Sequence, residues 1–419
     1  MKKLFILALS LLLLLSGCEK KEEAVEETVT EEEPVVEEPQ QEVYKASLIM
    51  AGDCLIHDSV YNANATEDGY DFTYATSELK KIVSGYDIAY YNQESILGGS
   101  EYGLSNYPAL NSPKEAGEAF VDAGFNLVSL ANNHTLDRYG SDGTKLIESS
   151  NDFWSAQDGV ITSGSYVSEE DKNEMRIGEV NGITYALLSY TYGTNGYTPK
   201  SGEEYLVNYI DKDAIKSDVE KYRDQVDLLI VAMHWGEEYN YVPTSEQISL
   251  AHFLADLDVD IVVGNHAHVI EPIEWIDDTL VIYALGNIIS GQYFSVQTLT
   301  GALCSLDVIK TVENGESDIS LENVKCELVY TLNQDEKWKV VPYSELDDAT
   351  LKDADKYFEF FKGILQGSVS EEAIEGVKNA DLSYLDTYVK KSYGISSVLS
   401  DGYPYFEDIT PYTDLEVIK

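Results

Sequence analysis

Side chains that can bind metal gather at the ends of apolar segments in this sequence. Five of the six histidines lie within a few residues of the C-terminal end of an apolar run, and acids and amides occupy similar positions. These residues are His57, His134, His234, His266, His268, Asp53, Asn92, Glu94, Asn133 and Asn287. Carboxylate, imidazole and amide groups form a mixed O/N donor set that suits Mn, Fe or Zn. The pattern predicts a divalent metal site, and two such ions can activate water and clamp the group under attack.

The segment "SLANNHTLD" follows the apolar run "FNLVSL" and has the clearest chemical pattern. We expect Asn133 to bind metal through its amide oxygen and His134 to donate a proton beside the site. Asp137 is expected to orient His134 by accepting its other N–H, although a helix-capping role is equally consistent with the pattern. Further along, "GNHAH" places His266 and His268 two residues apart after a glycine, so that both imidazoles can converge.

Each of these residues also has a purely structural interpretation. A single Asp or Asn after a strand is usually a turn or cap residue, and a single histidine is usually a packing or surface residue. His252 lies within an amphipathic helical pattern, away from a strand end, and is assigned a packing or surface role. His57 stays open between the two interpretations. Glu237 and Glu238 are interpreted as solvated loop acids, with substrate contact as the alternative. The joint pattern favours a site.

The apolar runs that carry these residues alternate with helical patterns, as in α/β domains. Ligands bind at the carboxyl ends of strands in such sheets. A helix is expected at 112–124, with Ser112 as N-cap, Pro113 first and Gly124 closing it. Another helix, at 244–258, has Thr244 or Ser245 as N-cap. Strands are expected at 46–52, 86–92, 125–131, 183–190, 226–234, 259–265 and 280–287.

The C-terminal region, 311–419, has a different pattern of predicted elements. Two antiparallel strands are expected within 317–344, followed by helical stretches near 348–366 and 370–392. No histidine occurs there, and we predict a sheet extension with a helical appendage. Cys54, Cys304 and Cys326 are too widely spaced for a disulfide framework or a zinc motif, so buried free thiols are expected.

The N-terminus is typical of an exported bacterial lipoprotein. Residues 1–17 combine a basic start with a short apolar run, and Leu15-Ser16-Gly17-Cys18 resembles a lipobox, in which Cys18 becomes acylated. An ordinary signal peptide is the alternative. Residues 18–44 are predicted to be the lipidated cysteine and an acidic disordered linker. We therefore expect an extracytoplasmic protein anchored to the cell membrane.

The formal net charge of −47 limits the partners. A field of this sign repels nucleic acid, which we exclude as a partner. An anionic substrate would need a local cationic centre, and bound metal is the natural candidate.

Taken in order, "GD", "NQE", "AGFNLVSLANNHTLDRYG", "HWGEEY", "VVGNHAHVIEPIEW" and "YALGN" resemble the capsule-biosynthesis protein CapA family. That family is linked to poly-γ-glutamate synthesis and belongs to the calcineurin-like metallophosphoesterase superfamily. The resemblance covers about residues 46–310, so we expect a domain at 45–310. It implies an α/β sandwich of two mixed β-sheets flanked by helices, here with a small C-terminal helical extension. It also implies that poly-γ-glutamate or another anionic polymer, and its synthesis machinery, are partners.

The resemblance implies roles where motifs match. Asp53, Asn133, His234, His266 and His268 match metal ligands, His134 matches the adjacent acid, and Glu94 stands where a bridging carboxylate is expected. Two departures matter. The superfamily usually opens Asp-x-His, whereas the first histidine here is His57, and its bridging Asp is replaced by the Asn-x-Glu of Asn92 and Glu94. A site with one metal is therefore also possible.

Three functions follow as hypotheses. The first is a metal-dependent hydrolase or transferase of capsule biosynthesis. The second is a non-catalytic factor that tethers or assembles a surface polymer through the same cleft. The third is a secreted metal-dependent nucleotidase or phosphodiesterase, which ranks lower because no additional domain for base stacking is evident.

Overall fold

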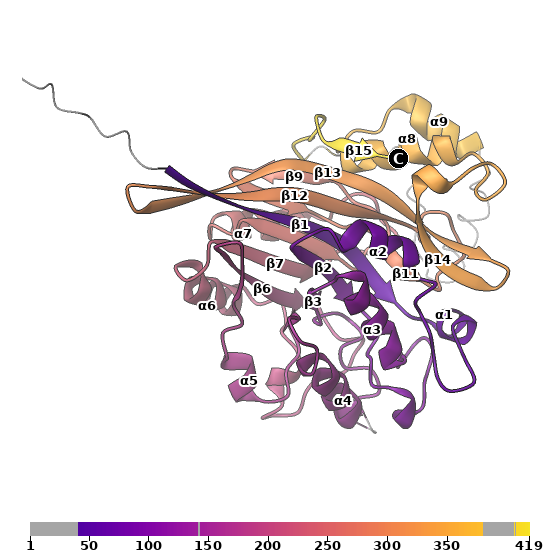
Figure 1. Cartoon of the computed structure of the whole chain (residues 1–419), viewed down its shortest axis with the longest axis horizontal. Coiled ribbons are helices and arrows are strands. Elements are labelled where there is room, and N and C mark those ends of the chain that lie inside the picture. The colour runs from indigo at the N-terminus through magenta and orange to yellow at the C-terminus, as the bar shows by residue number, and fades with distance from the viewer. Residues whose placement is uncertain (1–40, 141–142, 380–405, 407) are drawn as a thin grey trace, which may run out of the picture. The chain divides into compact units, whose positions relative to one another are not determined.

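The computed structural model describes residues 41–140, 143–379, 406 and 408–419. The predicted signal peptide, Cys18, most of the acidic linker and the end of the helical stretch predicted at 370–392 lie outside these residues. Strand β1 begins at Gln41 (Figure 1), so the prediction of a disordered linker as far as residue 44 is wrong for its last four residues. Among the described residues, no helix combines the length and apolarity needed to span a membrane.

The described strands form two mixed sheets, as predicted. The larger has nine strands in the order β14-β13-β12-β1-β2-β3-β4, with β11 also paired to β1 and β15 to β13. The smaller has six, in the order β5-β6-β7-β8-β10-β9. The strands of the larger sheet are β1 (Gln41–Leu55), β2 (Ile88–Gln93), β3 (Leu127–Ser129), β4 (Ile161–Ser163), β11 (Asn287–Ser290), β12 (Thr300–Glu313), β13 (Glu316–Gln334), β14 (Lys337–Pro342) and β15 (Glu416–Ile418). Those of the smaller are β5 (Gly178–Val180), β6 (Ile183–Thr191), β7 (Leu228–His234), β8 (Ile261–Asn265), β9 (Ile273–Ile276) and β10 (Thr279–Ile282).

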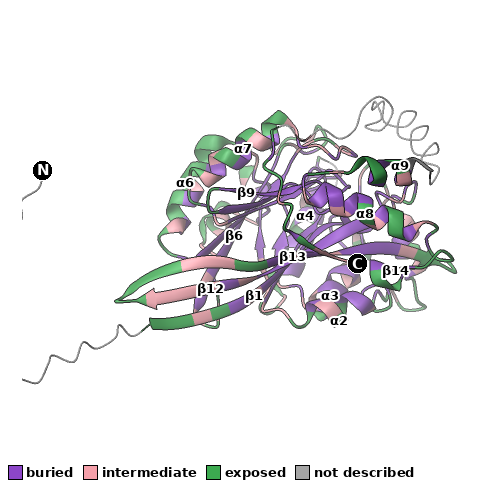
Figure 2. Ribbon diagram, turned by 90° about the horizontal axis from the view of Figure 1, so that it is seen from above, coloured by how far each residue is buried: buried purple, intermediate pink, exposed green. Residues whose placement is uncertain are grey.

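Alternating side chains of β1 separate two apolar cores. Leu48 and Met50 pack between the sheets with residues of β6, β7 and β8, whereas Ile49 and Ala51 point to the helix-covered face of the larger sheet. This is the period of two expected for a strand buried on both faces. The outer core of the smaller sheet is closed by α6 (Lys212–Arg223) and α7 (Ser245–Ala255), whose outward faces are exposed (Figure 2).

The remaining helices cover the larger sheet and its ends. Both α2 and α3 contribute side chains to the second core, and α8 adds Phe360, Phe361 and Ile364 to the core between the sheets. The helices are α1 (Asp58–Ala63), α2 (Ser77–Val83), α3 (Lys114–Ala123), α4 (Gly143–Ser155), α5 (Glu169–Asn173), α8 (Ala354–Leu365) and α9 (Glu371–Asn379). The domain boundary predicted at residue 310 falls inside β12, which pairs with β1 along ten residue positions, Gln41 to Met50.

The structure corrects two details of the predicted elements. The single strand predicted at 280–287 is two strands: β10 belongs to the smaller sheet and β11 to the larger, with the chain crossing between them at Tyr283–Gly286. Ser112 does not cap α3. Its hydroxyl donates to the carbonyl of Ile56 (2.9 Å), and Pro113 occupies the N-cap position without a side-chain bond. The predicted cap of α7 is confirmed as Thr244, which forms a capping box with Gln247.

Candidate metal centre

The carboxyl ends of strands from both sheets bring the predicted ligands together. Asp53 lies near the end of β1, where its register partners are Asn92 of parallel β2 and Asn287 of parallel β11. His234 is the last residue of β7, beside parallel β8, and His266 follows the end of β8. Because parallel strands end at the same edge, these side chains converge on one region.

Two groups of side chains could each hold a metal ion, and they share one residue. Asp53, Glu94 and His234 form one group, and Glu94, His266 and His268 form the other. Within each group the ligand atoms lie within 4.8 Å of one another, and all five residues are buried. Glu94 is common to both groups, and the resemblance implies a bridging carboxylate at this position.

Several buried polar atoms in the cluster have no hydrogen-bond partner among the residues that the structure describes. They include both carboxylate oxygens of Glu94, the Oδ1 atom of Asn92 and the Nδ1 atom of His266. Leaving such atoms unpaired costs about 1–3 kcal/mol each, so their concentration here needs a reason. Oxygen and imidazole nitrogen are ligands of Mn, Fe and Zn, so the residues present fit divalent metal ions.

Acidic groups dominate the electrostatics of the cluster. Burial raises the pKa of Glu94 well above its ordinary value, and the Asp53, Glu238 and Asp137 carboxylates add to this effect. Although burial opposes it, the carboxylates of Glu94 and Asp53 raise the pKa of His268 to about 10. Metal ions bound in the cluster would therefore compete with protons for these groups.

The pKa values of the other two histidines of the cluster are lowered. Burial lowers the pKa of both His234 and His266 well below the ordinary value, and the neighbouring imidazoles add to the effect. Both rings are therefore neutral at neutral pH, which is the form that binds metal.

The His-x-His turn has strained backbone. His266 and His268 both have positive φ angles, 94° and 55°, which are uncommon for residues other than glycine. Just before the turn, Gly264 allows a close approach of the chain, because a Cβ atom there would lie 1.7 Å from the carbonyl oxygen of Tyr283. The backbone N–H of His266 donates to Asp53 Oδ2 (3.0 Å), which ties the strained turn to the opposite sheet. Strain held in this way is common at functional sites.

The two consecutive amides after β3 have separate roles. Asn132 holds the loop: its Oδ1 accepts from the backbone N–H of His134 (3.0 Å) and its Nδ2 donates to the carbonyl of Gln93 (2.9 Å). Asn133 faces the cluster, with Oδ1 lying 3.1 Å from Nε2 of His234.

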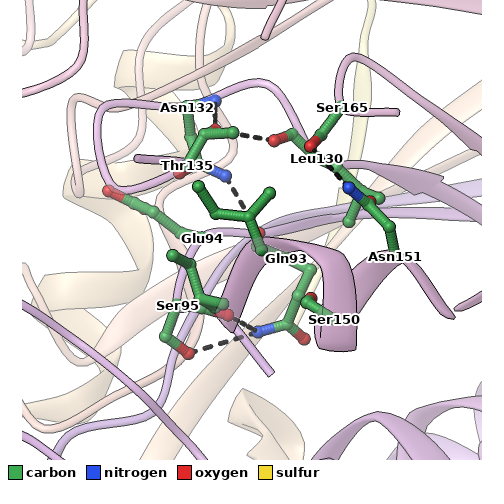
Figure 3. A pocket seen from close by; sticks show the side chains of 11 residues that line it. Gln93, Glu94, Ser95, Leu130, Asn132, Thr135, Ser150, Asn151 and Ser165 are labelled. Carbon is green, nitrogen blue, oxygen red and sulfur yellow. Dashed lines mark hydrogen bonds between the residues drawn. The ribbon is translucent and has the colours of Figure 1, made fainter. Parts of the chain in front are cut away.

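A small cavity of about 20 Å³ is lined in part by Asn132 and Thr135 of this loop (Figure 3). Its walls include Glu94 and Asn132, and the amide of Gln93 donates to the carbonyl and the hydroxyl of Ser95 beside it. A space of this size is enough for about one water molecule.

His134 and Asp137 form the predicted pair. Nδ1 of His134 lies 2.7 Å from Oδ2 of Asp137, which also accepts from the backbone N–H of Leu110 (2.6 Å). Both side chains are buried. The carboxylate therefore fixes the Nδ1–H tautomer and leaves Nε2 of His134 to exchange a proton. The alternative, in which Asp137 is only a helix cap, does not account for this contact.

His57 and His252 belong to neither group, and Asn287 contacts a member of the second group. Asn287 accepts from Nδ1 of His268 (3.0 Å), which orients that ring and leaves Nε2 for the cluster. Nδ1 of His57 lies 3.0 Å from the carbonyl of Leu55 and 3.2 Å from the backbone N–H of Gly291, and burial holds its pKa at about 4. His252 is exposed in α7, as expected. Cys54, Cys304 and Cys326 are free and buried, which confirms that prediction.

Sequence reasoning missed Tyr192. Its ring lies 4.6 Å from that of His266 and is nearly parallel to that of His234. The signal was its position: it follows β6 directly, at the same kind of strand end that carries the ligands.

Comparison with known proteins agrees with the resemblance. The family model for the bacterial capsule synthesis protein PGA_cap matches residues 47–292, more than half of the chain. The PGA biosynthesis protein CapA of Bacillus subtilis is 32% identical over 190 residues, covering 44% of this chain and 47% of that protein. The capsule biosynthesis protein CapA of Bacillus anthracis is 28% identical over 268 residues, covering 60% of this chain and 61% of that protein. The chain thus spans about half to three fifths of these relatives.

The solved structures that this chain resembles are less similar to it than these relatives. A 5′-nucleotidase from Candida albicans has a TM-score of 0.40 and 11% identity, covering 81% of this chain and 58% of that one. Similarity this low says nothing about the site, which rests on the geometry above. The match to the family model, by contrast, spans Asp53 to His268 and so includes every residue of the two ligand groups. The chain belongs to the PGA_cap family of bacterial capsule synthesis proteins.

Proposed function

We propose that this protein is a metal-dependent hydrolase or transferase of capsule or poly-γ-glutamate biosynthesis. The observation that carries the proposal is the shared carboxylate: Glu94 belongs to both ligand groups, and neither of its buried oxygens has a hydrogen-bond partner in the described part of the chain. Asp53, His234, His266 and His268 would complete the two sites. When bound, divalent ions supply an activated water and a positive charge that polarises the electrophile.

The chain's own residues supply proton transfer and orientation. Nε2 of His134 donates a proton to the leaving group as its bond to phosphorus or to an acyl carbon breaks, and a water oxygen or an acceptor forms the new bond. Asp137 stabilises the imidazolium form and keeps the ring in place through the 2.7 Å contact. Asn133 and Asn287 orient His234 and His268.

The surroundings of the site restrict the substrate. The groups that raise the pKa of Glu94, apart from its own burial, are the carboxylates of Asp53, Glu238 and Asp137. An anionic phosphoester or polymer carboxylate would therefore meet repulsion until metal ions are bound. Substrate binding should depend on metal loading, and the loaded site is the cationic centre that an acidic chain otherwise lacks.

The place of action is also part of the proposal. An acylated Cys18 would hold the protein at the outer face of the cell membrane, and residues 19–40, which are rich in Glu, would act as a tether. The membership of a capsule synthesis family supports a surface polymer, such as poly-γ-glutamate, and its synthesis machinery as partners.

The test compares the purified full chain with two histidine variants. Elemental analysis measures bound metal, and hydrolysis of bis(4-nitrophenyl) phosphate with added Mn²⁺ measures generic phosphodiesterase activity. His266→Ala should lose both metal and activity. His252→Ala, which changes an exposed histidine of α7, should lose neither. The proposal is refuted if the wild type contains no bound metal and the substitution His266→Ala changes neither metal content nor activity.

A further inference from the structure

The loop between β11 and β12, residues 291–299, contains a buried glutamine whose amide has partners at both ends. Oε1 of Gln292 accepts from Nδ2 of Asn287 (3.0 Å), and Nε2 of Gln292 donates to the hydroxyl oxygen of Tyr239 (3.1 Å). The loop also holds the backbone of Gln292, because the hydroxyl of Thr298 donates to its carbonyl. Gln292 therefore fixes two side chains that come from different parts of the sequence.

The partners of Asn287 determine which way its amide points. A backbone carbonyl can only accept, and that of Thr298 lies 2.8 Å from Nδ2 of Asn287. The second N–H of Nδ2 goes to Gln292. Oδ1 of Asn287 therefore faces Nδ1 of His268 at 3.0 Å, whereas Oδ2 of Asp53 lies 3.4 Å from the same nitrogen. A His268 ring that binds metal through Nε2 thus keeps its one proton on Nδ1, where it donates to Asn287.

Tyr239 connects the far end of these bonds to the turn that carries the ligands. Its backbone N–H donates to the carbonyl of Ala267, between the two histidines (2.7 Å), and its φ angle is 65°. Its ring centroid lies 6.0 Å from that of His268. The hydrogen bonds that run from His268 through Asn287 and Gln292 to Tyr239 therefore return to the same turn. Buried networks of this kind can be worth more than the sum of their single bonds.

We propose that Gln292 is a positioning residue of the metal centre. It occupies the second N–H of Asn287, keeps the amide oxygen of that residue toward His268, and so holds Nε2 of His268 in the direction of the cluster. The inference rests on the proposed function and adds to it a residue that belongs to neither ligand group. It also gives the loop 291–299 a role, which is to hold the end of β11 against the His-x-His turn.

The test removes both hydrogen bonds of the side chain and keeps its length. Calorimetric titration of the metal-stripped full chain with Mn²⁺ should show about tenfold weaker binding for Gln292→Met, since loss of a partner that orients a ligand typically costs 10–100-fold. Gln292→Glu keeps oxygens that can accept from Asn287 and from the Tyr239 hydroxyl, and should recover most of this loss. If Gln292 only filled space, the order would be reversed, because Met would be tolerated and a buried charge would not.

Gln297→Met is the matched control. Gln297 is a buried glutamine of the same loop, and neither of its amide atoms has a hydrogen-bond partner among the described residues. This variant should bind Mn²⁺ like the wild type. Thermal unfolding of the metal-stripped proteins checks that each variant is folded.

A spectroscopic measurement tests the position of the proton directly. In the full chain with isotope-labelled histidine, saturated with diamagnetic Zn²⁺, Nδ1–H of His268 should give a signal that exchanges slowly with water. Gln292→Met should broaden or shift this signal, and Gln297→Met should leave it unchanged. The inference is overturned if Gln292→Met keeps the wild-type signal or the wild-type affinity for Mn²⁺, or if Gln292→Glu binds Mn²⁺ more weakly than Gln292→Met. A wild type that binds no Mn²⁺ would refute the proposed function itself, and this inference with it.

Discussion

Glu94→Gln should abolish metal binding while leaving the metal-free fold intact. The carboxylate is shared by both ligand groups, so one substitution weakens two sites at once. Loss of a residue that only orients a ligand costs 10–100-fold in metal affinity, and loss of a charged shared ligand should cost at least 100-fold. This corresponds to at least about 2.7 kcal/mol of binding free energy.

The same substitution should not destabilise the metal-free protein. Burial and nearby carboxylates raise the pKa of Glu94, so its charged form is disfavoured when metal is absent, and glutamine keeps nearly the same shape without that charge. We expect the free energy of unfolding to change by less than about 1 kcal/mol at pH 6, a range typical of mild substitutions.

Calorimetry with Mn²⁺ and thermal unfolding of the metal-stripped full chain provide the two measurements. Glu237→Gln is the matched control, since it removes an exposed acid that belongs to neither group. The reasoning is refuted if Glu94→Gln binds Mn²⁺ like the wild type, or if Glu237→Gln loses binding to the same extent.

Other predictions concern catalysis, pH and the cell. His134→Ala should lower phosphodiester hydrolysis by roughly 10²–10⁴-fold while Mn²⁺ binding stays unchanged, and joint loss of both would contradict its role as the proton donor. Burial raises the pKa of Glu271 from 4.5 to about 8, so the folded state holds more protons than the unfolded state between these values, and stability falls as the pH rises through this window. Glu271→Gln should therefore be more stable than the wild type at pH 8, by on the order of 3–5 kcal/mol, and similar at pH 4.5; unfolding curves with equal pH dependence for both proteins would exclude this. Chelation by EDTA should lower the thermal midpoint of the wild type reversibly, and a midpoint independent of Mn²⁺ would argue against a site that stabilises the fold. In cells, a strain carrying Asp53→Ala and His268→Ala should lose surface polymer, whereas undiminished retention would favour the tethering hypothesis.

Most of the ligand set could be predicted because polar residues after apolar strands are an unusual combination. Nothing local explains Asn133 after "FNLVSL" or a His-x-His sequence after "VDIVVG", so their joint position was informative. The strand order was needed to decide which of them meet. Asp53 lies beside Asn287 because the chain leaves the smaller sheet after β10 and then forms β11, which pairs with β1. The continuous apolar run "LVIYALG" gave no sign of this crossing.

The missed features depend on contacts between distant residues. Serine is a common N-cap residue, but the hydroxyl of Ser112 donates to the carbonyl of the distant Ile56 and does not cap the helix. The separate roles of Asn132 and Asn133 follow from the Gln93 carbonyl and the His234 ring, neither of which is near in sequence. The position of Tyr192 directly after β6 was too weak a signal, because tyrosine is common in this chain, at 31 residues, and a tyrosine after a strand is usually a packing residue.

The most direct test of the central claim is anomalous diffraction from crystals of the protein grown with Mn²⁺. We predict anomalous density among Asp53, Glu94, His234, His266 and His268, with metal–ligand distances of about 2.0–2.3 Å and Glu94 in contact with both peaks where two are present. Manganese bound only at surface acids, with Glu94 in contact with none, would contradict the account.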